Sequence, residues 1–228
     1  MTLHHLAIIM DGNRRWALEN NLSTNDGHRE GANNLWDIIK KSSELNIKYL
    51  TVFGFSTENW KRSKIEIIFL LSLLDDFLED AKSKIKNYDF NIRFIGDLSV
   101  YDKKIQDKMF HIDEVTKHNE GSIITIALNY GGRYDILNTL NNFINTKKEN
   151  QSLALNEMNF KSFSLNKDIP DPDMLIRTGG EKRLSNFLLW DLAYTELFFV
   201  THMWPEFTGL LLEKYVSDFF KRKRNYGA

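Results

Sequence analysis

Short, almost uninterrupted apolar runs alternate along this chain with longer segments whose apolar residues recur at helical spacing. The runs that we expect to be strands are Leu6–Met10, Tyr49–Phe55, Asn91–Ile95, Ile123–Asn129, Met174–Arg177 and Leu197–Val200. The segments that we expect to be helices are Gly31–Asn46, Lys64–Lys86, Val100–His118, Tyr134–Thr146 and Leu210–Lys223. Continuous apolar strands separated by helices are typical of parallel sheets covered on both faces. The sequence therefore predicts an α/β fold with a single open, mostly parallel six-stranded sheet flanked by helices, in one domain of residues 1–228.

Composition excludes several classes of protein and of site. With 42% hydrophobic residues among 228, the chain has enough apolar surface to build a core, which excludes collagen-like and wholly disordered chains. Thirty basic residues face 31 acidic ones, so we expect no nucleic acid among the partners. The absence of cysteine excludes disulfides, zinc–thiolate sites and cysteine nucleophiles, and is compatible with a cytoplasmic protein. The apolar start lacks the preceding positive charge of a signal peptide, and we expect it to be a buried strand.

A polar cluster, Asp11-Gly12-Asn13-Arg14-Arg15-Trp16, directly follows the first predicted strand. In open α/β sheets, ligands bind beyond the carboxyl ends of the strands. A carboxylate, a glycine, an amide and two arginines at the opening of a helix suit a polyanion held with a metal ion, with Asp11 as a ligand of Mg²⁺. An ordinary Asp-Gly turn with surface arginines is the alternative reading of this cluster taken alone.

Two more polar clusters follow predicted strands. Residues Ser56–Arg62 come after the second strand, and Arg177–Asn186 come after the fifth. The second of these places three basic residues, two glycines and two hydroxyl groups in one short loop, a composition typical of phosphate sites. Three clusters at successive strand ends predict one large anion-binding site. The glycine-rich phosphate loop of nucleotide hydrolases is absent, which argues against nucleoside triphosphate chemistry.

Longer segments of the chain resemble the cis-prenyltransferase family, which includes the undecaprenyl diphosphate synthases. The matching segments are His5–Asn13, Gly27–Gly31, Phe53–Trp60, Ile95–Asp97, Asn129–Arg133 and Arg177–Trp190. The resemblance covers essentially residues 4–227, in several ordered segments. It implies a Mg²⁺-dependent homodimeric enzyme that condenses isopentenyl diphosphate with an allylic diphosphate, usually farnesyl diphosphate, to form a long-chain cis-polyprenyl diphosphate such as the lipid carrier precursor of cell-wall synthesis. It also implies a cytoplasmic location, with peripheral membrane contact for product release.

The resemblance also assigns roles to residues. Asp11 and Asn59 would be catalytic, Asp11 as the Mg²⁺ carboxylate and Asn59 in proton removal, and Glu196 would be a second Mg²⁺ contact. The allylic diphosphate would meet the first cluster and His28, whereas Arg177, Arg183 and Ser185 would bind isopentenyl diphosphate. The whole substrate-binding set would be Gly12, Asn13, Arg14, Arg15, Trp16, His28, Ser56, Thr57, Glu58, Trp60, Arg62, Arg177, Arg183, Leu184 and Ser185.

The hydrocarbon tail of such a product requires an apolar tunnel. Helix residues 65–78 could form its wall, through Ile67, Ile68, Leu70, Leu71, Leu73 and Leu74, or they could simply belong to the core. The acidic segment Asp75–Asp80 lies on the same predicted helix, and we interpret it as a solvated face. The polar stretch Lys147–Lys167 is expected to be a surface loop or short helix, and the basic run Lys221–Arg224 a solvated helix end or, as an alternative, a contact with an anionic membrane.

Two positions depart from the family pattern. Arg14 stands where the family has glycine, and Thr24, expected in a loop before His28, stands where it commonly has arginine. We hypothesise that Arg14 replaces the charge missing at Thr24; in the alternative, Arg14 points into solvent. Three alternative functions are a shorter-chain cis-prenyl diphosphate synthase, a non-catalytic partner subunit, and a nucleotide-binding regulatory domain. The presence of Asp11, Asn59 and the two loop arginines argues against the second.

Overall fold

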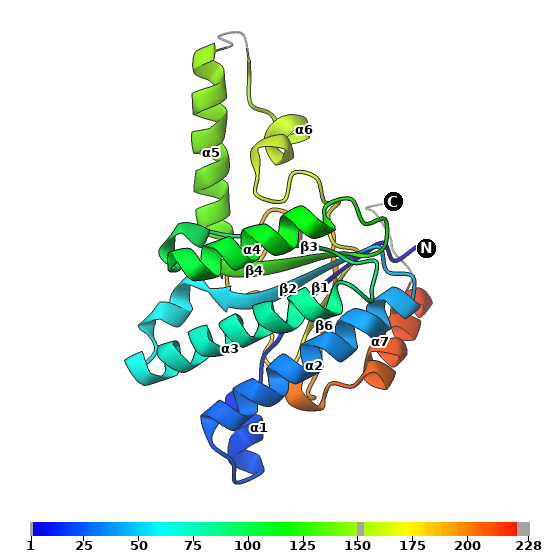
Figure 1. The fold of residues 1–228 in the computed structure, drawn as a ribbon. Helices are drawn as coiled ribbons and strands as arrows, with labels where there is room; N and C mark the ends of the chain where they lie inside the picture. The colour runs from blue at the N-terminus through cyan, green and yellow to red at the C-terminus, as the bar shows by residue number, and fades with distance from the viewer. Residues whose placement is uncertain (1, 150–152, 223–228) are drawn as a thin grey trace.

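Figure 1 shows a computed structural model of the chain, which describes residues 2–149 and 153–222. Six strands form one sheet in the order β3-β4-β2-β1-β5-β6, and every neighbouring pair is parallel. The strands are β1 (His5–Ile9), β2 (Tyr49–Ser56), β3 (Asn91–Ile95), β4 (Ile123–Tyr130), β5 (Met174–Arg177) and β6 (Glu196–Phe199). The predicted six-stranded α/β fold is confirmed.

The helices largely follow the predicted amphipathic segments. They are α1 (Asn13–Glu19), α2 (Thr24–Glu44), α3 (Lys64–Lys84), α4 (Lys103–Thr116), α5 (Gly132–Glu149), α6 (Glu157–Phe160) and α7 (Gly209–Lys221). Short 3₁₀ turns include η1 (Thr57–Lys61) and η3 (Lys161–Phe163). The polar stretch Lys147–Lys167 thus contains α6 and η3, while Lys223 and Arg224 of the basic run lie outside the described residues. No helix in the described ranges is long and apolar enough to cross a membrane.

Helix α2 begins at Thr24, seven residues before the predicted start at Gly31. Ser23 caps the helix: its hydroxyl accepts from the Asp26 backbone, and the Asp26 carboxylate accepts from the Ser23 backbone. Thr24 is therefore in the first helical turn and not in a loop. The glycines inside α2 have a packing reason, because a Cβ at Gly27 or Gly31 would collide with Asn13. Those glycines let α1 approach α2 closely.

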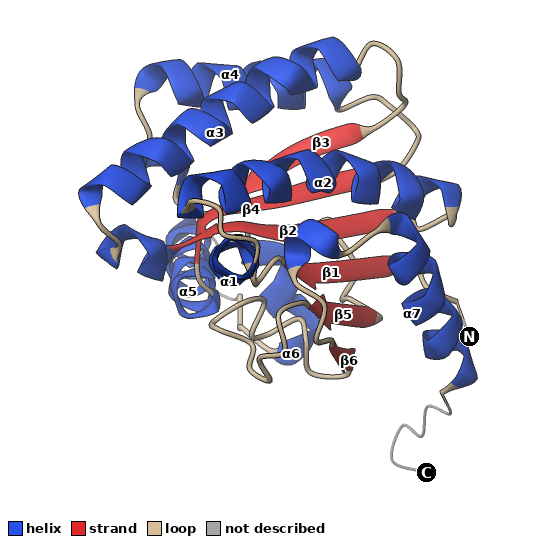
Figure 2. Cartoon of the chain, turned by 90° about the horizontal axis from the view of Figure 1, so that it is seen from below, coloured by secondary structure: helices blue, strands red, loops and turns tan. Residues whose placement is uncertain are grey.

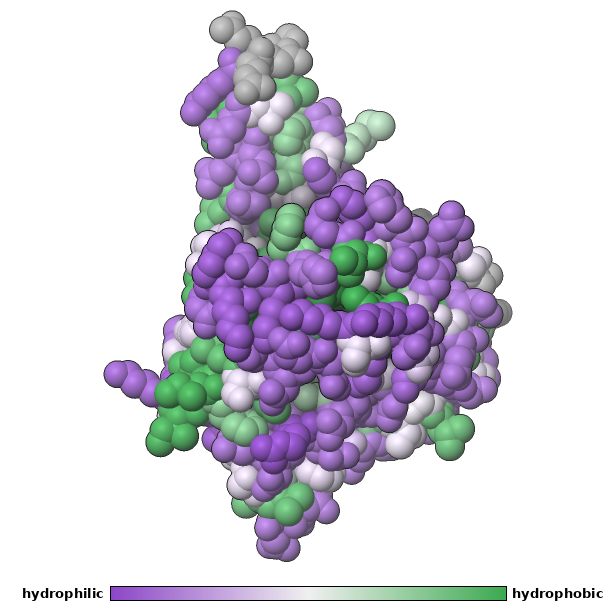
Figure 3. All heavy atoms as spheres, in the orientation of Figure 1, coloured by the Kyte–Doolittle hydropathy of each residue, from purple (hydrophilic) through white to green (hydrophobic). Residues whose placement is uncertain are grey.

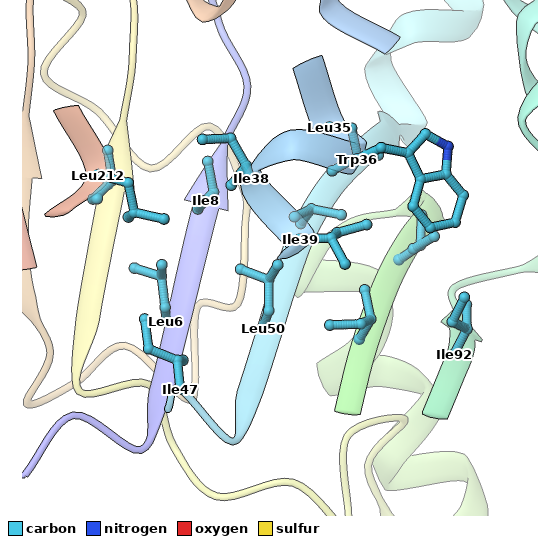
Figure 4. Packing of buried hydrophobic residues seen from close by; sticks show 14 of the residues in the cluster. Leu6, Ile8, Leu35, Trp36, Ile38, Ile39, Ile47, Leu50, Ile92 and Leu212 are labelled. Atoms are coloured by element: carbon cyan, nitrogen blue, oxygen red, sulfur yellow. The ribbon is translucent and has the colours of Figure 1, made fainter. Parts of the chain in front are cut away.

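Both faces of the sheet are covered. In β1, Leu6 and Ile8 belong to one buried cluster, whereas Ala7 and Ile9 belong to another on the opposite face. The first cluster includes residues of α2, α3, α4 and α7, which cover that face of the strands in Figure 2. Figure 4 shows this packing, with side chains of α2 and α7 over β1 and β2. On the other face, residues 187–192 pack against the sheet. A strand that buries both faces reads as a continuous apolar run, which is why β1 was predictable.

Parallel pairing brings the carboxyl ends of all the strands to one edge. Residues that follow β1, β2 and β5 therefore converge there, and these are the residues of the three polar clusters. Gly12, which has a φ of 114°, turns the chain from β1 into α1. A Cβ at Gly12 would lie 2.9 Å from the Cβ of Met203, so only glycine fits this turn.

Candidate active site

The backbone of Asp11 is fixed by two segments that are distant in sequence. Its N–H donates to the Thr178 hydroxyl at 2.9 Å, and the same hydroxyl donates to the Asp11 carbonyl at 2.7 Å. The backbone N–H of Trp204 also donates to the Asp11 carbonyl at 3.0 Å. Asp11 is thus held against the start of the loop that follows β5, and its carboxylate projects from the carboxyl edge of the sheet.

Two guanidinium groups hold the Asp11 carboxylate. Arg15 donates to Oδ1 at 3.1 Å from one turn along α1, and Arg177 donates to Oδ2 at 2.9 Å from the end of β5. Arg177 is buried, with 3% of its surface exposed, and also donates to the Ser185 hydroxyl at 2.7 Å and to the Arg183 carbonyl. The first and third clusters therefore form one charged centre. Burial strengthens the hydrogen bonds of such a centre, because water screens them less.

The loop that follows β5 is joined to its neighbours by Asn186. Its side-chain amide donates to Glu58 at 3.0 Å, and its side-chain oxygen accepts from the Arg133 backbone at 2.9 Å. Its carbonyl accepts from the Gly132 backbone at 2.5 Å. Asn186, at a φ of 65°, thus connects the ends of β2, β4 and β5. Sequence reasoning did not select Asn186 or Arg133 as site residues, although both lie inside segments that match the family, which was the available signal.

The oxygen of the Asn59 side chain forms a hydrogen bond within the turn that follows β2. Its Oδ1 accepts from the Ser56 backbone at 2.9 Å, closing a capping box at the start of η1. The backbone N–H fixes which end of the amide is the oxygen, so the other end is an NH₂ group. That group can donate to a diphosphate oxygen but cannot accept a proton. Asn59 thus lines the polar cleft with its oxygen already hydrogen-bonded, and its expected part in proton removal stays a prediction.

Glu66, in the first turn of α3, joins His28 and Arg62. One carboxylate oxygen accepts from Arg62 at 2.8 Å and contacts His28 Nε2 at 3.2 Å, while the other lies 4.0 Å from Arg14. Burial lowers the pKa of His28, although its contact with Glu66 acts in the opposite direction. Burial raises the pKa of Glu66, but Arg62 and His28 outweigh that effect and the net pKa lies below its usual range. Sequence reasoning missed Glu66, since this contact depends on how α3 packs on α2.

Three connected hollows open at this edge of the sheet. The polar cleft, of ≈ 720 Å³, and the side cleft, of ≈ 550 Å³, share Asp11, Asn13, His28 and Arg62. Side chains of all three clusters line the polar cleft: Asp11, Asn13, Ser56, Glu58, Asn59, Arg62, Arg177, Arg183 and Ser185. The side cleft is lined by Gly12, Arg14, Arg15, Leu18 and Thr24 in addition to residues that it shares with the polar cleft. Arg14 and Thr24, the two departures from the family pattern, therefore border the same cleft.

The third hollow, the apolar pocket, extends from the polar cleft between α2, α3 and the sheet. Its volume is ≈ 140 Å³, and Met10, Asn13, His28 and Phe53 belong to both linings. Leu70, Leu71, Leu73 and Leu74 of α3 line it as predicted. Ile67 and Ile68 do not, and Ile68 is 69% exposed. The expectation that these two isoleucines form part of the wall is wrong: Ile67 lies on the same helix face as Leu70 and Leu74 but one turn before the pocket, and Ile68 lies on a different face.

Some predicted site residues lie outside these linings. They are Trp16, Thr57, Trp60, Leu184 and Glu196. The Trp60 ring packs against Phe55 and Tyr101, and its N–H donates to Asn129 at 2.9 Å. Trp60 therefore packs at the end of β2 outside the linings of the three hollows, and its expected contact with substrate stays a prediction.

Glu196 lies at the opposite end of the sheet from Asp11. It is the first residue of β6 and pairs with Met174 and, through it, with Leu6, at the amino ends of their strands. Its carboxylate accepts from Arg222 at 2.6 Å. Strands rise about 3.3 Å per residue, so the length of β6 alone separates Glu196 from the site by roughly 10 Å. Within one copy of the chain, Glu196 and Asp11 are not brought together around one ion.

The donors at the cleft fit a magnesium ion that is shared with a phosphate ligand. Mg²⁺ is commonly bound by one or two carboxylates together with substrate phosphates. Asp11 supplies a carboxylate with 28% of its side chain exposed, and Asn13 Oδ1 is a buried oxygen without a hydrogen-bond partner. In the described part of the chain, no group of three or more His, Cys, Asp or Glu side chains could hold a metal ion. An all-protein magnesium cage is therefore not present among those residues.

The acidic segment of α3 has no such role. Asp75 forms ion pairs with Lys104 at 2.8 Å and with Lys108 of α4. Glu79 also pairs with Lys108, at 2.5 Å. These carboxylates fasten α3 to α4 on the surface, away from the clefts. The solvated acidic face that the sequence predicted is thus partly neutralised by α4.

Comparison with known proteins identifies the family. A model of the family described as "Putative undecaprenyl diphosphate synthase" matches residues 9–227. An isoprenyl transferase of Treponema denticola is 44% identical over 99% of this chain and 97% of its own length. One of Helicobacter pylori is 41% identical over 99% of this chain and 97% of its own length.

Comparison with solved structures points to the same family. The structure titled as a probable undecaprenyl diphosphate synthase from Campylobacter jejuni is 35% identical and superimposes with a TM-score of 0.84 over 100% of both chains. Lavandulyl diphosphate synthase from Lavandula x intermedia, in complex with dimethylallyl diphosphate, is 35% identical with a TM-score of 0.94, over 100% of this chain and 99% of its own. The chain belongs to the undecaprenyl diphosphate synthase family of prenyltransferases.

Proposed function

We propose that this prenyltransferase condenses isopentenyl diphosphate with farnesyl diphosphate, repeatedly, to form a long-chain cis-polyprenyl diphosphate such as undecaprenyl diphosphate. The observation that carries the proposal is the position of Asp11, held between Arg15 and Arg177 where a polar cleft meets an apolar pocket. Diphosphate groups require cations and donors, and a prenyl chain requires an apolar wall. The polar cleft supplies the cations and donors, and the adjoining apolar pocket supplies the apolar wall.

In each condensation, the carbon–oxygen bond of the allylic diphosphate breaks and the alkene of isopentenyl diphosphate supplies the electron pair for a new carbon–carbon bond. Diphosphate and one proton are released. Negative charge therefore grows on the departing diphosphate, and pre-positioned cations lower the barrier by stabilising it. A magnesium ion, when bound, would add a Lewis-acid contribution to that stabilisation.

The residues of the site divide between two diphosphates. We assign the allylic diphosphate to the side cleft, where Arg14, Arg15 and His28 lie beside Asp11. We assign isopentenyl diphosphate to the part of the polar cleft that Arg183 and Ser185 line. Arg177 is joined to Asp11 and Ser185 and so links the two positions. Since an alkene is a weak nucleophile, holding the two substrates in contact supplies much of the acceleration.

A shorter-chain cis-prenyl diphosphate synthase is the second candidate. Its support is the size of the apolar pocket, ≈ 140 Å³ against ≈ 720 Å³ for the polar cleft. A pocket of that size holds only part of a long hydrocarbon chain without movement of α3. The third alternative, a non-catalytic partner subunit, is disfavoured because Asp11, Arg177 and Arg183 all line the cleft.

The assembly that we propose is a homodimer. Large apolar side chains on and near α5 are exposed: Leu137 by 62%, Ile144 by 51% and Trp190 by 40%. Helix α5 also projects from the body of the molecule in Figure 1. Burial of this surface against a second copy would remove apolar area from water. Light scattering of the purified chain measures the mass directly, and a monomeric mass would contradict the proposal.

One experiment tests the proposed reaction. The chain is incubated with radiolabelled isopentenyl diphosphate, farnesyl diphosphate and Mg²⁺, and products are separated by chain length, with a chelator-treated sample as control. We expect a long polyprenyl product that disappears on chelation. Products that stop after one or two additions would establish the shorter-chain alternative. Absence of any product from folded protein would contradict both enzymatic proposals, and activity that survives chelation would remove magnesium from the mechanism.

A further inference from the structure

The apolar pocket is lined by a buried hydroxyl group that has no hydrogen-bond partner. Among the described residues that line this pocket and neither cleft, Tyr101 and Trp204 alone carry polar side-chain atoms. The indole N–H of Trp204 donates to the Gly31 carbonyl at 2.7 Å. The hydroxyl of Tyr101 is buried and forms no hydrogen bond with any part of the chain that the structure describes. Buried tyrosine hydroxyls usually find a partner, so this exception requires an explanation.

The Tyr101 ring is held in place by its neighbours in the sequence and in the core. Tyr101 follows the 3₁₀ turn η2 (Leu98–Val100) and precedes Asp102, whose carboxylate caps α4 by accepting from the Ile105 backbone at 2.9 Å. The ring packs against Trp60 with a centroid separation of 6.1 Å, and only 4% of Tyr101 is exposed. Figure 3 shows mostly hydrophilic side chains over the middle of the face where α3 and α4 lie in Figure 1. The hydroxyl therefore cannot turn into solvent without movement of the start of α4.

The hydroxyl of Tyr101 also keeps its proton and remains a hydrogen-bond donor. Burial raises the pKa of Tyr101, and the nearby Asn129 backbone, which is outside hydrogen-bonding geometry, only partly opposes this shift. The pocket, of ≈ 140 Å³, shares lining residues with the polar cleft and has room for several water molecules at about 30 Å³ each. Water that enters the unliganded pocket can hydrate the hydroxyl, whereas a saturated hydrocarbon chain offers it no acceptor. A chain that reaches the hydroxyl therefore leaves it unpaired, which costs free energy.

We propose that Tyr101 is a specificity-determining residue that limits how far a hydrocarbon chain extends into the apolar pocket. Chains long enough to reach its hydroxyl expel the water that would hydrate it, and shorter chains do not. The inference deepens the proposed function and rests on it, because the chain in question is the tail of the growing product. Each condensation that brings hydrocarbon to Tyr101 becomes less favourable, so products are released earlier. Phenylalanine has the same ring without the hydroxyl and would remove this limit.

Binding of unreactive alkyl diphosphates tests the proposal without the reaction. Inorganic pyrophosphate and n-butyl, n-octyl and n-dodecyl diphosphates are titrated calorimetrically against the wild type and Tyr101→Phe. We expect equal affinities for pyrophosphate and the butyl compound, and an affinity of the variant for the dodecyl compound that is about tenfold higher. The chain length at which the two proteins diverge gives the depth of Tyr101. A matched control, Tyr88→Phe, removes a hydroxyl from a ring that stacks on Phe90 outside the three hollows and should bind like the wild type.

The lengths of the products test the specificity role. In the condensation assay, we expect Tyr101→Phe to shift the products toward longer chains, while Tyr88→Phe gives the wild-type distribution. A purely structural role of Tyr101 would change total turnover and leave the ratio of long to short products unaltered, which would contradict the proposal. The expected difference in alkyl diphosphate binding, together with a wild type that forms no prenyl product, would contradict only the proposed reaction.

Three other results would overturn the proposal. The first is equal affinity of the wild type and Tyr101→Phe at every chain length. The second is an equal gain in affinity for pyrophosphate, which would place the effect outside the apolar pocket. The third comes from urea denaturation without ligand. An unpaired hydroxyl can be removed without loss of stability, so a markedly lower free energy of unfolding of Tyr101→Phe would show that the hydroxyl has a partner within the protein.

Discussion

Replacing Asp11 by asparagine tests the centre of the proposed site. Asp11 accepts from Arg15 at 3.1 Å and from Arg177 at 2.9 Å. Asparagine keeps the size and one acceptor oxygen, but it turns an NH₂ group toward the other guanidinium and removes the negative charge. We expect turnover to fall by ~10² or more, the scale seen when one electrostatic stabiliser of a transition state is lost. Steady-state kinetics with saturating isopentenyl diphosphate and farnesyl diphosphate measures this.

The same substitution should also lower the free energy of unfolding, and the burial of the two side chains limits how large this decrease can be. Removal of one partner from a fully buried ion pair costs ~3–5 kcal/mol. The side chain of Arg177 is 4% exposed but that of Asp11 is 28% exposed, so water compensates part of the loss. Arg177 also keeps its hydrogen bond to Ser185 at 2.7 Å. We therefore expect the free energy of unfolding to fall by about 1–3 kcal/mol, measured by urea denaturation.

Binding of inorganic pyrophosphate distinguishes an electrostatic role of Asp11 from a role in holding the two arginines in position. Without metal, Asp11→Asn removes a negative charge from a cationic cleft, so affinity for pyrophosphate should be unchanged or higher. With Mg²⁺, affinity should be lower than in the wild type, because a metal ligand is lost. Near-normal turnover in a folded variant would refute the role of Asp11 in the reaction. Weaker pyrophosphate binding without metal would show that Asp11 acts by holding the arginines in place.

Three other predictions concern binding and pH. Arg177→Ala and Arg183→Ala should each raise KM for isopentenyl diphosphate by roughly ten- to hundredfold and much more than KM for farnesyl diphosphate; equal effects would contradict the assignment. Arg14→Gly should weaken farnesyl diphosphate binding, and Thr24→Arg should restore it with a non-additivity of ~0.5–3 kcal/mol in measured affinities, whereas strict additivity would make Arg14 a bystander. Burial lowers the pKa of His5 from 6.5 to about 4. The folded state therefore binds fewer protons than the unfolded state between these values, and the free energy of unfolding should fall by about 3 kcal/mol as pH drops through that window. His5→Asn should flatten this dependence in urea titrations at several pH values, and an unchanged slope would refute it.

The strands were predictable because burial on both faces leaves a direct mark in the sequence. Every residue of β1 is buried and all but His5 are apolar. The end of this apolar run predicted that Asp11 follows the strand. The start of α2 was missed although its signal is present. Ser23 and Asp26 form a capping box, and the pattern can be read from the sequence. The predicted helix began only at Gly31, whereas the structure places both Gly27 and Gly31 inside α2 at its close contact with α1.

The expected role of Glu196 as a second Mg²⁺ contact does not agree with the position of this residue in the sheet. The predicted strand begins at Leu197, so Glu196 precedes a parallel strand and belongs to the amino edge of the sheet. Asp11 follows its strand and belongs to the carboxyl edge. The strand prediction alone was therefore sufficient to separate the two carboxylates. The contact of Glu66 with His28 was not accessible in this way, because no pattern in the sequence gives the distance between α2 and α3.

The loop after β5, which carries the third polar cluster, contains residues in a strained backbone conformation. Ser185, Asn186 and Leu188 have φ values of 48°, 65° and 40°, in the left-handed region that residues other than glycine rarely adopt. Such conformations persist only where surrounding contacts compensate for them. Asn186 supplies three of those contacts, to Glu58 and to the backbone at the start of α5, and Arg177 supplies another through Ser185. The loop that carries Arg183 is thus fastened to the ends of β2 and β4, and the distance between the two proposed diphosphate positions is set by the rigid edge of the sheet.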